Sequence, residues 1–191
     1  LAHVPDINDF VKGFSILLKP QGIATFEFPH LLNLLKWNQF DTIYHEHYSY
    51  LSLTAVQSIF DMNGLSIFDV EELTTHGGSL RVYVQNSNSG QFELTSSVSR
   101  LINIEKNAGV CSLEYYNGFQ YKVEKVKNDF LDFLIQAKKN GKKIIGYGAA
   151  AKGNTMMNFS GIGADLIDFI VDKNPVKQGK YMPGSRIPIL A

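Results

Sequence analysis

The stretch KKIIGYGAAAKGNTMMNFSGIGADLIDFIVD, residues 142–172, decides the fold class. An apolar run at 143–146 leads into a turn of glycine and alanine, a helical pattern follows through 156–159, and a second apolar run fills 166–171. A strand, a helix and a strand in that order predict a right-handed βαβ unit with parallel strands. The chain is therefore expected to be an α/β protein.

The residues before this stretch also alternate between helical and strand-like patterns. Helices are predicted where apolar residues recur every three or four positions, and strands where short apolar or alternating runs end at Pro or Gly. The predicted elements are a helix over 9–18, a strand over 23–28, a helix with a capping box that begins at Thr54 and ends at Gly64, and strands over 65–70 and 80–85.

Residues 91–140 are expected to be largely helical. Apolar side chains recur every three or four positions from Leu113 to Phe133, and Asn140-Gly141 supplies the stop. This helix would pack on a core or join two domains. The expected division is 1–88 for a first domain and 89–191 for the long helix with a second domain.

The composition excludes several classes of protein. Apolar residues make up 45% of the 191 residues and the net charge is zero, which argues against a nucleic-acid partner but not against a small phosphorylated ligand. The single cysteine excludes an intrachain disulfide and a cysteine-based zinc site. No apolar run is long enough to span a bilayer and no secretory signal is present, so we expect no membrane association and a cytoplasmic location.

The segment DTIYHEHYSY, residues 41–50, concentrates groups that handle protons. In extended geometry His45 and His47 would share one face, with Tyr44, Glu46 and Tyr48 on the other. A histidine suits general-base duty because its unperturbed pKa is about 6.5. A buried polar network accounts for this segment equally well, and a metal site on the two histidines is a weaker third alternative because no further ligand cluster accompanies them.

The glycine turn at 146–154 lies between a predicted strand and a predicted helix, where exposed amides favour an anion. From Gly146 it matches the loose dinucleotide pattern G-x-G-x-x-A, and Asp172 follows about 20 residues beyond the pattern. A nicotinamide cofactor is therefore one interpretation. Lys152 and Asn154 suit a nucleotide diphosphate equally well, and a turn without a ligand is the third alternative.

The segment His76-Gly-Gly-Ser79-Leu-Arg81 is a third candidate. Paired glycines before a strand usually form a turn. Ser79 and Arg81 are nevertheless suited to hydrogen-bond a sugar hydroxyl or a phosphate.

Taken together, these segments resemble the sugar C-methyltransferases that make branched deoxysugars. The likeness runs in one order over nearly the whole chain. The matching pieces are Leu1-Ala-His-Val-Pro5, Phe26-Glu-Phe-Pro-His30, Phe40-Asp-Thr-Ile-Tyr-His-Glu-His-Tyr-Ser-Tyr-Leu51, His76-Gly-Gly-Ser-Leu-Arg81, Gly146-Tyr-Gly-Ala-Ala-Ala-Lys-Gly-Asn-Thr155, and Asp172-Lys-Asn-Pro175 with Lys177-Gln-Gly179.

The resemblance implies a domain organisation. Residues 1–88 would be the later part of a class I methyltransferase domain with a Rossmann-like fold, and 89–191 the long helix with a truncated second Rossmann-like domain. The chain would be a carboxyl-terminal fragment. Most of the site for the methyl donor, S-adenosylmethionine, would lie upstream, so the fragment is expected to bind the donor poorly and not to turn over alone.

The resemblance also implies the chemistry. The substrate would be a nucleotide-linked 4-keto-deoxysugar, from which a base removes the proton beside the ketone before the enolate attacks the methyl group. His47 would be that base, Glu46 and Tyr44 its orienting partners, and His3 a donor or proton relay. The expected substrate-binding residues are His76, Ser79, Arg81, Gly146, Tyr147, Gly148, Lys152 and Asn154.

Two other functions remain open at this level. One is a nicotinamide-dependent oxidoreductase built on the turn at Gly146 with Asp172. The other is a non-catalytic nucleotide-sugar-binding module that uses the same turn and leaves the histidines idle. The sequence does not indicate an oligomeric state.

Overall fold

The computed structural model describes all residues, 1–191, and its contacts divide them into two compact units. The first unit comprises Leu1–Gln39 and His45–Asn117, and the second comprises Phe40–Tyr44 and Gly118–Ala191. The expected boundary between residues 88 and 89 therefore falls inside the first unit.

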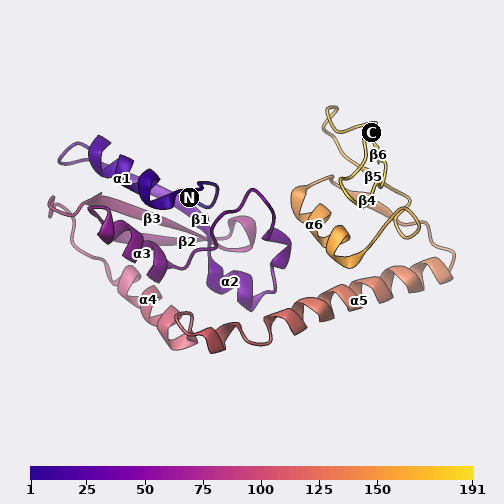
Figure 1. Cartoon of the computed structure of the whole chain (residues 1–191), viewed down its shortest axis with the longest axis horizontal. Coiled ribbons are helices and arrows are strands. Elements are labelled where there is room, and N and C mark those ends of the chain that lie inside the picture. The colour runs from indigo at the N-terminus through magenta and orange to yellow at the C-terminus, as the bar shows by residue number, and fades with distance from the viewer. The chain divides into compact units, whose positions relative to one another are not determined.

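The first unit is built on a three-stranded sheet with the order β1-β3-β2. Its strands are β1 (Ile23–Pro29), β2 (Leu65–Leu73) and β3 (Ser79–Asn86). Strands β1 and β2 are both antiparallel to β3, so they run parallel to each other (Figure 1). The expected strands are confirmed, and β2 and β3 are joined through the short 3-10 turn η2 (Thr75–Gly77).

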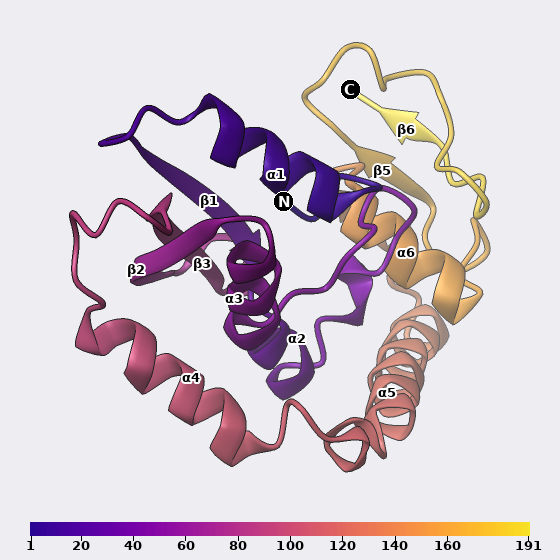
Figure 2. The ribbon, with the colours of Figure 1, turned by 60° about the vertical axis from the view of Figure 1, so that its left-hand side comes forward.

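Three helices cover one face of this sheet, namely α1 (Ile7–Leu17), α3 (Leu53–Met62) and α4 (Ser96–Ala108) (Figure 2). Every second residue of β1 and β3 faces this layer. The ring of Phe26 on β1 lies 4.7 Å from that of Phe14 on α1 and 5.0 Å from that of Phe60 on α3, measured between centroids. Alternation along the strands therefore gives this sheet one buried and one polar face.

The start of α3 differs from the expected capping box at Thr54. The N-cap is Ser52, whose hydroxyl accepts a hydrogen bond from the amide of Ala55 at 3.1 Å. Thr54 lies inside the helix and its hydroxyl donates to Glu105 instead. The capping prediction was wrong because the local cap is Ser52, two residues earlier, and the hydroxyl of Thr54 is directed to a carboxylate distant in sequence.

The stretch expected to be largely helical, 91–140, consists of separate pieces. After α4 come the 3-10 turn η3 (Leu113–Tyr116) and the long helix α5 (Phe119–Lys139). Gly109 at the end of α4 and Gly118 before α5 have left-handed backbone conformations and separate the three elements. Two short elements that the sequence analysis did not predict, α2 (Leu31–Lys36) and η1 (Phe40–Thr42), lie between β1 and α3.

The second unit contains the predicted βαβ unit. Strand β4 (Ile145–Tyr147) leads through helix α6 (Ala151–Ser160) to β5 (Phe169–Val171), and the two strands are parallel. A third parallel strand, β6 (Ile189–Leu190), follows in the order β4-β5-β6. The α/β class is therefore confirmed.

Candidate functional site

The structure brings two of the predicted site residues, His3 and His47, together. Their ring centroids lie 4.8 Å apart with the planes inclined at 68°, an edge-to-face arrangement. The amide of Tyr48 donates to the carbonyl of Ala2 at 2.8 Å, so the main chain holds the two segments side by side. His3 is exposed and His47 is partly exposed, which leaves the imidazole of His47 outside the sealed core.

The neighbours of His47 do not follow the expected extended alternation. His45 and Glu46 form an exposed turn, so His45 does not share a strand face with His47. The ring centroid of Tyr50 lies 6.3 Å from that of His47. Tyr44 belongs to the second unit, where its amide donates to the carbonyl of Thr42 at 3.2 Å.

The His76-Gly-Gly-Ser79 segment forms the tight turn between β2 and β3. Gly77 and Gly78 have φ values of +83° and +116°, which favour glycine, and a Cβ on Gly78 would lie 2.4 Å from Nδ2 of Asn33. The buried hydroxyl of Ser79 donates to the carbonyl of Thr75 at 3.1 Å, whereas His76 is exposed. Backbone geometry thus accounts for the glycines of this motif.

Arg81 lies on the polar face of the sheet between two carboxylates. Its guanidinium is 3.0 Å from Glu27 and 3.5 Å from Glu71, and the hydroxyl of Tyr83 also donates to Glu71. Hydrogen bonds from Arg81 and from Thr75 hold the pKa of Glu27 below its usual value. Arg81 is therefore engaged in a cross-strand network, and a substrate would have to compete with Glu27 and Glu71 for it.

In the second unit, the glycine turn lies between β4 and α6 as expected. Gly146 is packed so closely on β5 that a Cβ would lie 2.8 Å from Cγ1 of Ile170, whereas Gly148 has φ +89° with open space beside it. No side chain caps the first turn of α6, which carries Lys152 and Asn154. Tyr147 is 78% exposed beside this turn.

Asp172, the acidic residue of the dinucleotide pattern, serves the turn itself. One carboxylate oxygen accepts from the amide of Ala149 at 2.7 Å and the other from the amide of Asn174 at 2.8 Å. Hydrogen bonds from Asn174 and Ala149, with a smaller contribution from Lys177, lower the pKa of Asp172. Because both oxygens already hold main-chain amides, this carboxylate is poorly placed to bind ribose hydroxyls.

The sequence reasoning missed a buried polar pair, His30 and Glu105. Nε2 of His30 lies 2.7 Å from Oε1 of Glu105, and the two side chains are 1% and 0% exposed. A signal was present, because Glu105 follows Val98, Leu101 and Ile102 on the apolar face of α4. A carboxylate on such a face needs buried partners.

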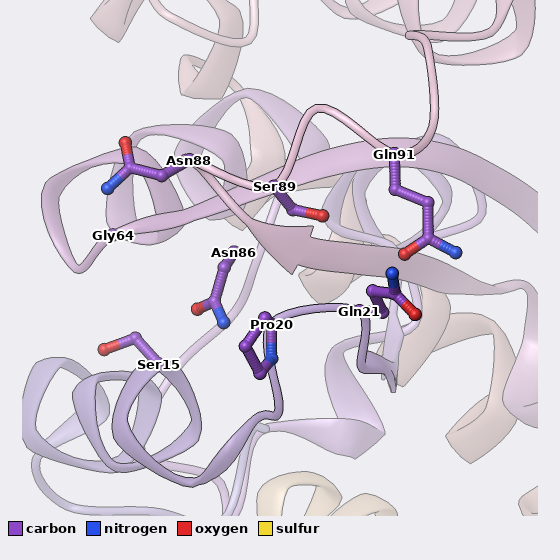
Figure 3. A pocket seen from close by; sticks show the side chains of 8 residues that line it. All are labelled: Ser15, Pro20, Gln21, Gly64, Asn86, Asn88, Ser89 and Gln91. Atoms are coloured by element: carbon purple, nitrogen blue, oxygen red, sulfur yellow. The ribbon is translucent and has the colours of Figure 1, made fainter.

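A polar pocket of about 830 Å³ was also missed. It lies where β1 and β2 begin and β3 ends, whereas His30 lies at the opposite end of these strands (Figure 3). None of the predicted site residues lines it. Its lining is uncharged and consists of Ser15, Pro20, Gln21, Gly64, Asn86, Asn88, Ser89 and Gln91.

No group of three or more His, Cys, Asp or Glu side chains is arranged to hold a metal ion. None of the helices combines the length and the apolar character that crossing a membrane requires.

Comparison with known proteins identifies the family. Residues 74–191 match the family described as the C-methyltransferase C-terminal domain. Over 188 residues the chain is 38% identical to C-methyltransferase NovU of Streptomyces niveus, a match that covers 98% of this chain and 44% of that relative. The chain thus spans less than half the length of this curated relative. Since the family match extends over more than half of residues 1–191, the chain belongs to the C-methyltransferase family.

Proposed function

We propose that this chain is part of an enzyme that transfers a methyl group from S-adenosylmethionine to a carbon atom of a nucleotide-linked 4-keto-deoxysugar. The observation that carries the proposal is the partly exposed imidazole of His47, held edge-on against His3 in a chain of the C-methyltransferase family. Methylation at carbon needs a carbanion equivalent, which a ketone provides when the proton beside it is removed.

His47 acts as the general base in this proposal. An imidazole accepts the proton from the carbon beside the ketone near neutral pH, and the enolate oxygen that develops needs a hydrogen-bond donor. His3 is suited to supply that donor or to relay the proton, because its ring contacts that of His47. Glu46, its neighbour in the chain, is assigned a supporting role in orienting the base.

The methyl group is the part of the chemistry that the donor supplies. Within residues 1–191, the glycine turn between a strand and a helix at 146–151 is the feature that most resembles a nucleoside site. Its carboxylate, Asp172, already accepts hydrogen bonds from the amides of Ala149 and Asn174. These residues do not fit the adenosine of the donor. We therefore assign the donor to other parts of the enzyme and assign proton abstraction to this chain.

The turn between β4 and α6 is assigned to the diphosphate of the nucleotide sugar. The uncapped amides at the start of α6 favour an anion, and the open space beside Gly148 allows a phosphate to approach the backbone. Lys152 adds a cation, and Asn154 and Tyr147 add polar side chains. A thermal-shift assay tests this assignment: stabilisation by thymidine diphosphate would support it, and stabilisation by NAD instead would favour the oxidoreductase alternative.

The substitution His47→Ala in the intact enzyme tests the base role. We expect methylation to fall by at least about 100-fold, the usual contribution of a positioned base, while nucleotide-sugar binding stays within a few-fold. The matched control is His45→Ala, which removes an exposed histidine from the same turn and is expected to leave turnover unchanged. Turnover retained by His47→Ala would remove His47 from this role. Nucleotide-sugar binding would then remain as the function of this chain.

A further inference from the structure

The carboxylate of Glu105 is a buried junction between segments that are distant in sequence. It accepts hydrogen bonds from the amides of Leu53 and Thr54 at 2.7 and 2.8 Å, from the Thr54 hydroxyl at 2.6 Å, and from Nε2 of His30 at 2.7 Å. Burial raises the pKa of Glu105, but the hydrogen bonds from His30, Thr54 and Leu53 outweigh it and the pKa lies below its usual value. The group is therefore an anion at neutral pH.

The four donors come from the two ends of one chain segment. His30 follows β1 directly, whereas Leu53 and Thr54 form the first turn of α3. Between these ends, Leu51 forms a parallel bridge with His30 and its carbonyl accepts from the amide of Leu31 at 3.0 Å. Glu105 thus links the side chain of His30, which pairs with Leu51, to the main chain at Leu53 and Thr54, directly after the residues that follow His47.

The buried imidazole of His30 has one role in this network. Since an ionised carboxylate only accepts hydrogen bonds, Nε2 of His30 carries the proton that points at Glu105. Nδ1 is buried and has no hydrogen-bond partner. The orientation of the ring is consequently set by Glu105, and the position of the end of β1 is set with it.

We propose that Glu105 and His30 are positioning residues for His47, an inference that rests on the base role proposed above. Apolar side chains of similar size would fill the same space, but they would not fix the directions of the four donors. The chain that follows His47 has two anchors: the first is the contact of Tyr48 with Ala2, and the second is the contact of Leu51 with Leu31 and His30. Loosening the second anchor displaces the imidazole without removing any group that touches the substrate.

The first test is Glu105→Gln in the intact enzyme, which keeps the shape but turns an amide NH₂ group toward the donors. We expect kcat to fall at least about tenfold with KM within about threefold, the pattern of a misplaced catalytic group. The control is Leu101→Ala, which leaves a cavity on the same face of α4 and destabilises the fold without removing a donor or acceptor of the junction. A kcat loss no larger than that of Leu101→Ala would overturn the proposal.

A second pair keeps the test decisive if Glu105→Gln does not fold. His30→Gln retains a donor near the position of Nε2, whereas His30→Leu removes it and stays apolar. We expect His30→Gln to recover most of the activity that His30→Leu loses. Equal activity of the two variants would overturn the proposal.

A readout independent of turnover separates this proposal from the base role of His47. Diethyl pyrocarbonate modifies accessible imidazoles, and exposed His45 and His76 serve as internal references in the same mass spectrum. We expect Glu105→Gln to change the modification rate of His47 relative to His76, with Leu101→Ala unchanged; equal relative rates in all three proteins count against positioning. Turnover retained by His47→Ala defeats the base role itself.

Discussion

Gly78 offers a sharp test of why the His-Gly-Gly-Ser segment needs its glycines. Its φ of +116° and ψ of +105° lie where a side chain is strongly disfavoured. An added Cβ would also lie 2.4 Å from Nδ2, 3.0 Å from Cγ and 3.3 Å from Cβ of Asn33. Since Asn33 meets it along its whole length, a rotation of the amide group does not relieve the overlap.

The cost of Gly78→Ala follows from these two effects. The backbone conformation costs about 1–3 kcal/mol for a residue other than glycine. Overpacking against Asn33 adds about 1–3 kcal/mol, and the stiffer unfolded chain returns about 0.4–1 kcal/mol. We expect a loss of about 2–4 kcal/mol in the free energy of unfolding, because local movement of α2 relieves part of the overlap.

Urea unfolding followed by the fluorescence of Trp37 measures this loss, because the single tryptophan ends α2, the helix that carries Asn33. With a slope of about 2 kcal/mol per molar urea, the midpoint falls by about 1–2 M. Gly90→Ala is the matched control: its φ is +59° and no atom lies near the added Cβ, so only the backbone cost of about 1–2 kcal/mol applies and its midpoint falls by about 0.5–1 M. Equal shifts in the two variants would refute the steric reasoning.

Two further substitutions test other parts of the structure. Ser52→Ala removes the hydroxyl that caps α3 and should cost about 1 kcal/mol, measured by the same urea assay against Ser58→Ala on the exposed side of the helix; equal values for the two variants would show that the cap contributes nothing. Asp168→Asn tests a pH dependence in the second unit, where the amide of Ile144 and the ammonium of Lys138 lower the pKa of Asp168. Because its folded pKa is lowered, Asp168 contributes its full stabilisation above the unfolded pKa of about 3.9, and this stabilisation is lost as the pH falls through the folded pKa. The circular-dichroism midpoint of Asp168→Asn in urea should therefore lie below that of the wild type at pH 7 and converge with it in acid, and a constant gap would contradict this account.

Local patterns predicted most of the secondary structure. Strand β1 and helix α1 begin and end within a few residues of their expected limits because their apolar spacing and stop residues are local signals. The βαβ unit was also predicted, since the turn at Gly146–Gly148 has its glycines where packing on Ile170 and a positive φ require them. Such features depend on residues close in sequence.

What the sequence left out depends on contacts between distant residues. The helical stretch breaks at Gly109 and Gly118, yet apolar spacing alone carried the prediction across both. At α3, Thr54 resembled a local cap, but Glu105 is the acceptor it uses. The turn at His45 and Glu46 takes the place of the extended geometry considered for this segment, and the amide of Tyr48 after it is held by Ala2, which is distant in sequence.

For candidate site residues, the sequence indicated types of group better than their surroundings. It named His3 and His47, which do meet, and it could not foresee that Arg81 is held by Glu27 and Glu71. Asp172 matched a dinucleotide pattern that its contacts with main-chain amides argue against. Each of these outcomes depends on the pairing of strands or loops, which spacing alone does not determine.

The place of Glu105 in the chain bears on how this protein can be divided for expression. A fragment that ends at residue 88 would contain His30, Leu53 and Thr54 but not the carboxylate that all three require. In that fragment the two buried amides at the start of α3 and the imidazole of His30 would lack their acceptor. The hydrophobic layer supplied by α4 would also be missing. A cut placed after Asn117 preserves that junction and separates only Phe40–Tyr44 from the rest of the second unit, so the gene is better divided there than after residue 88.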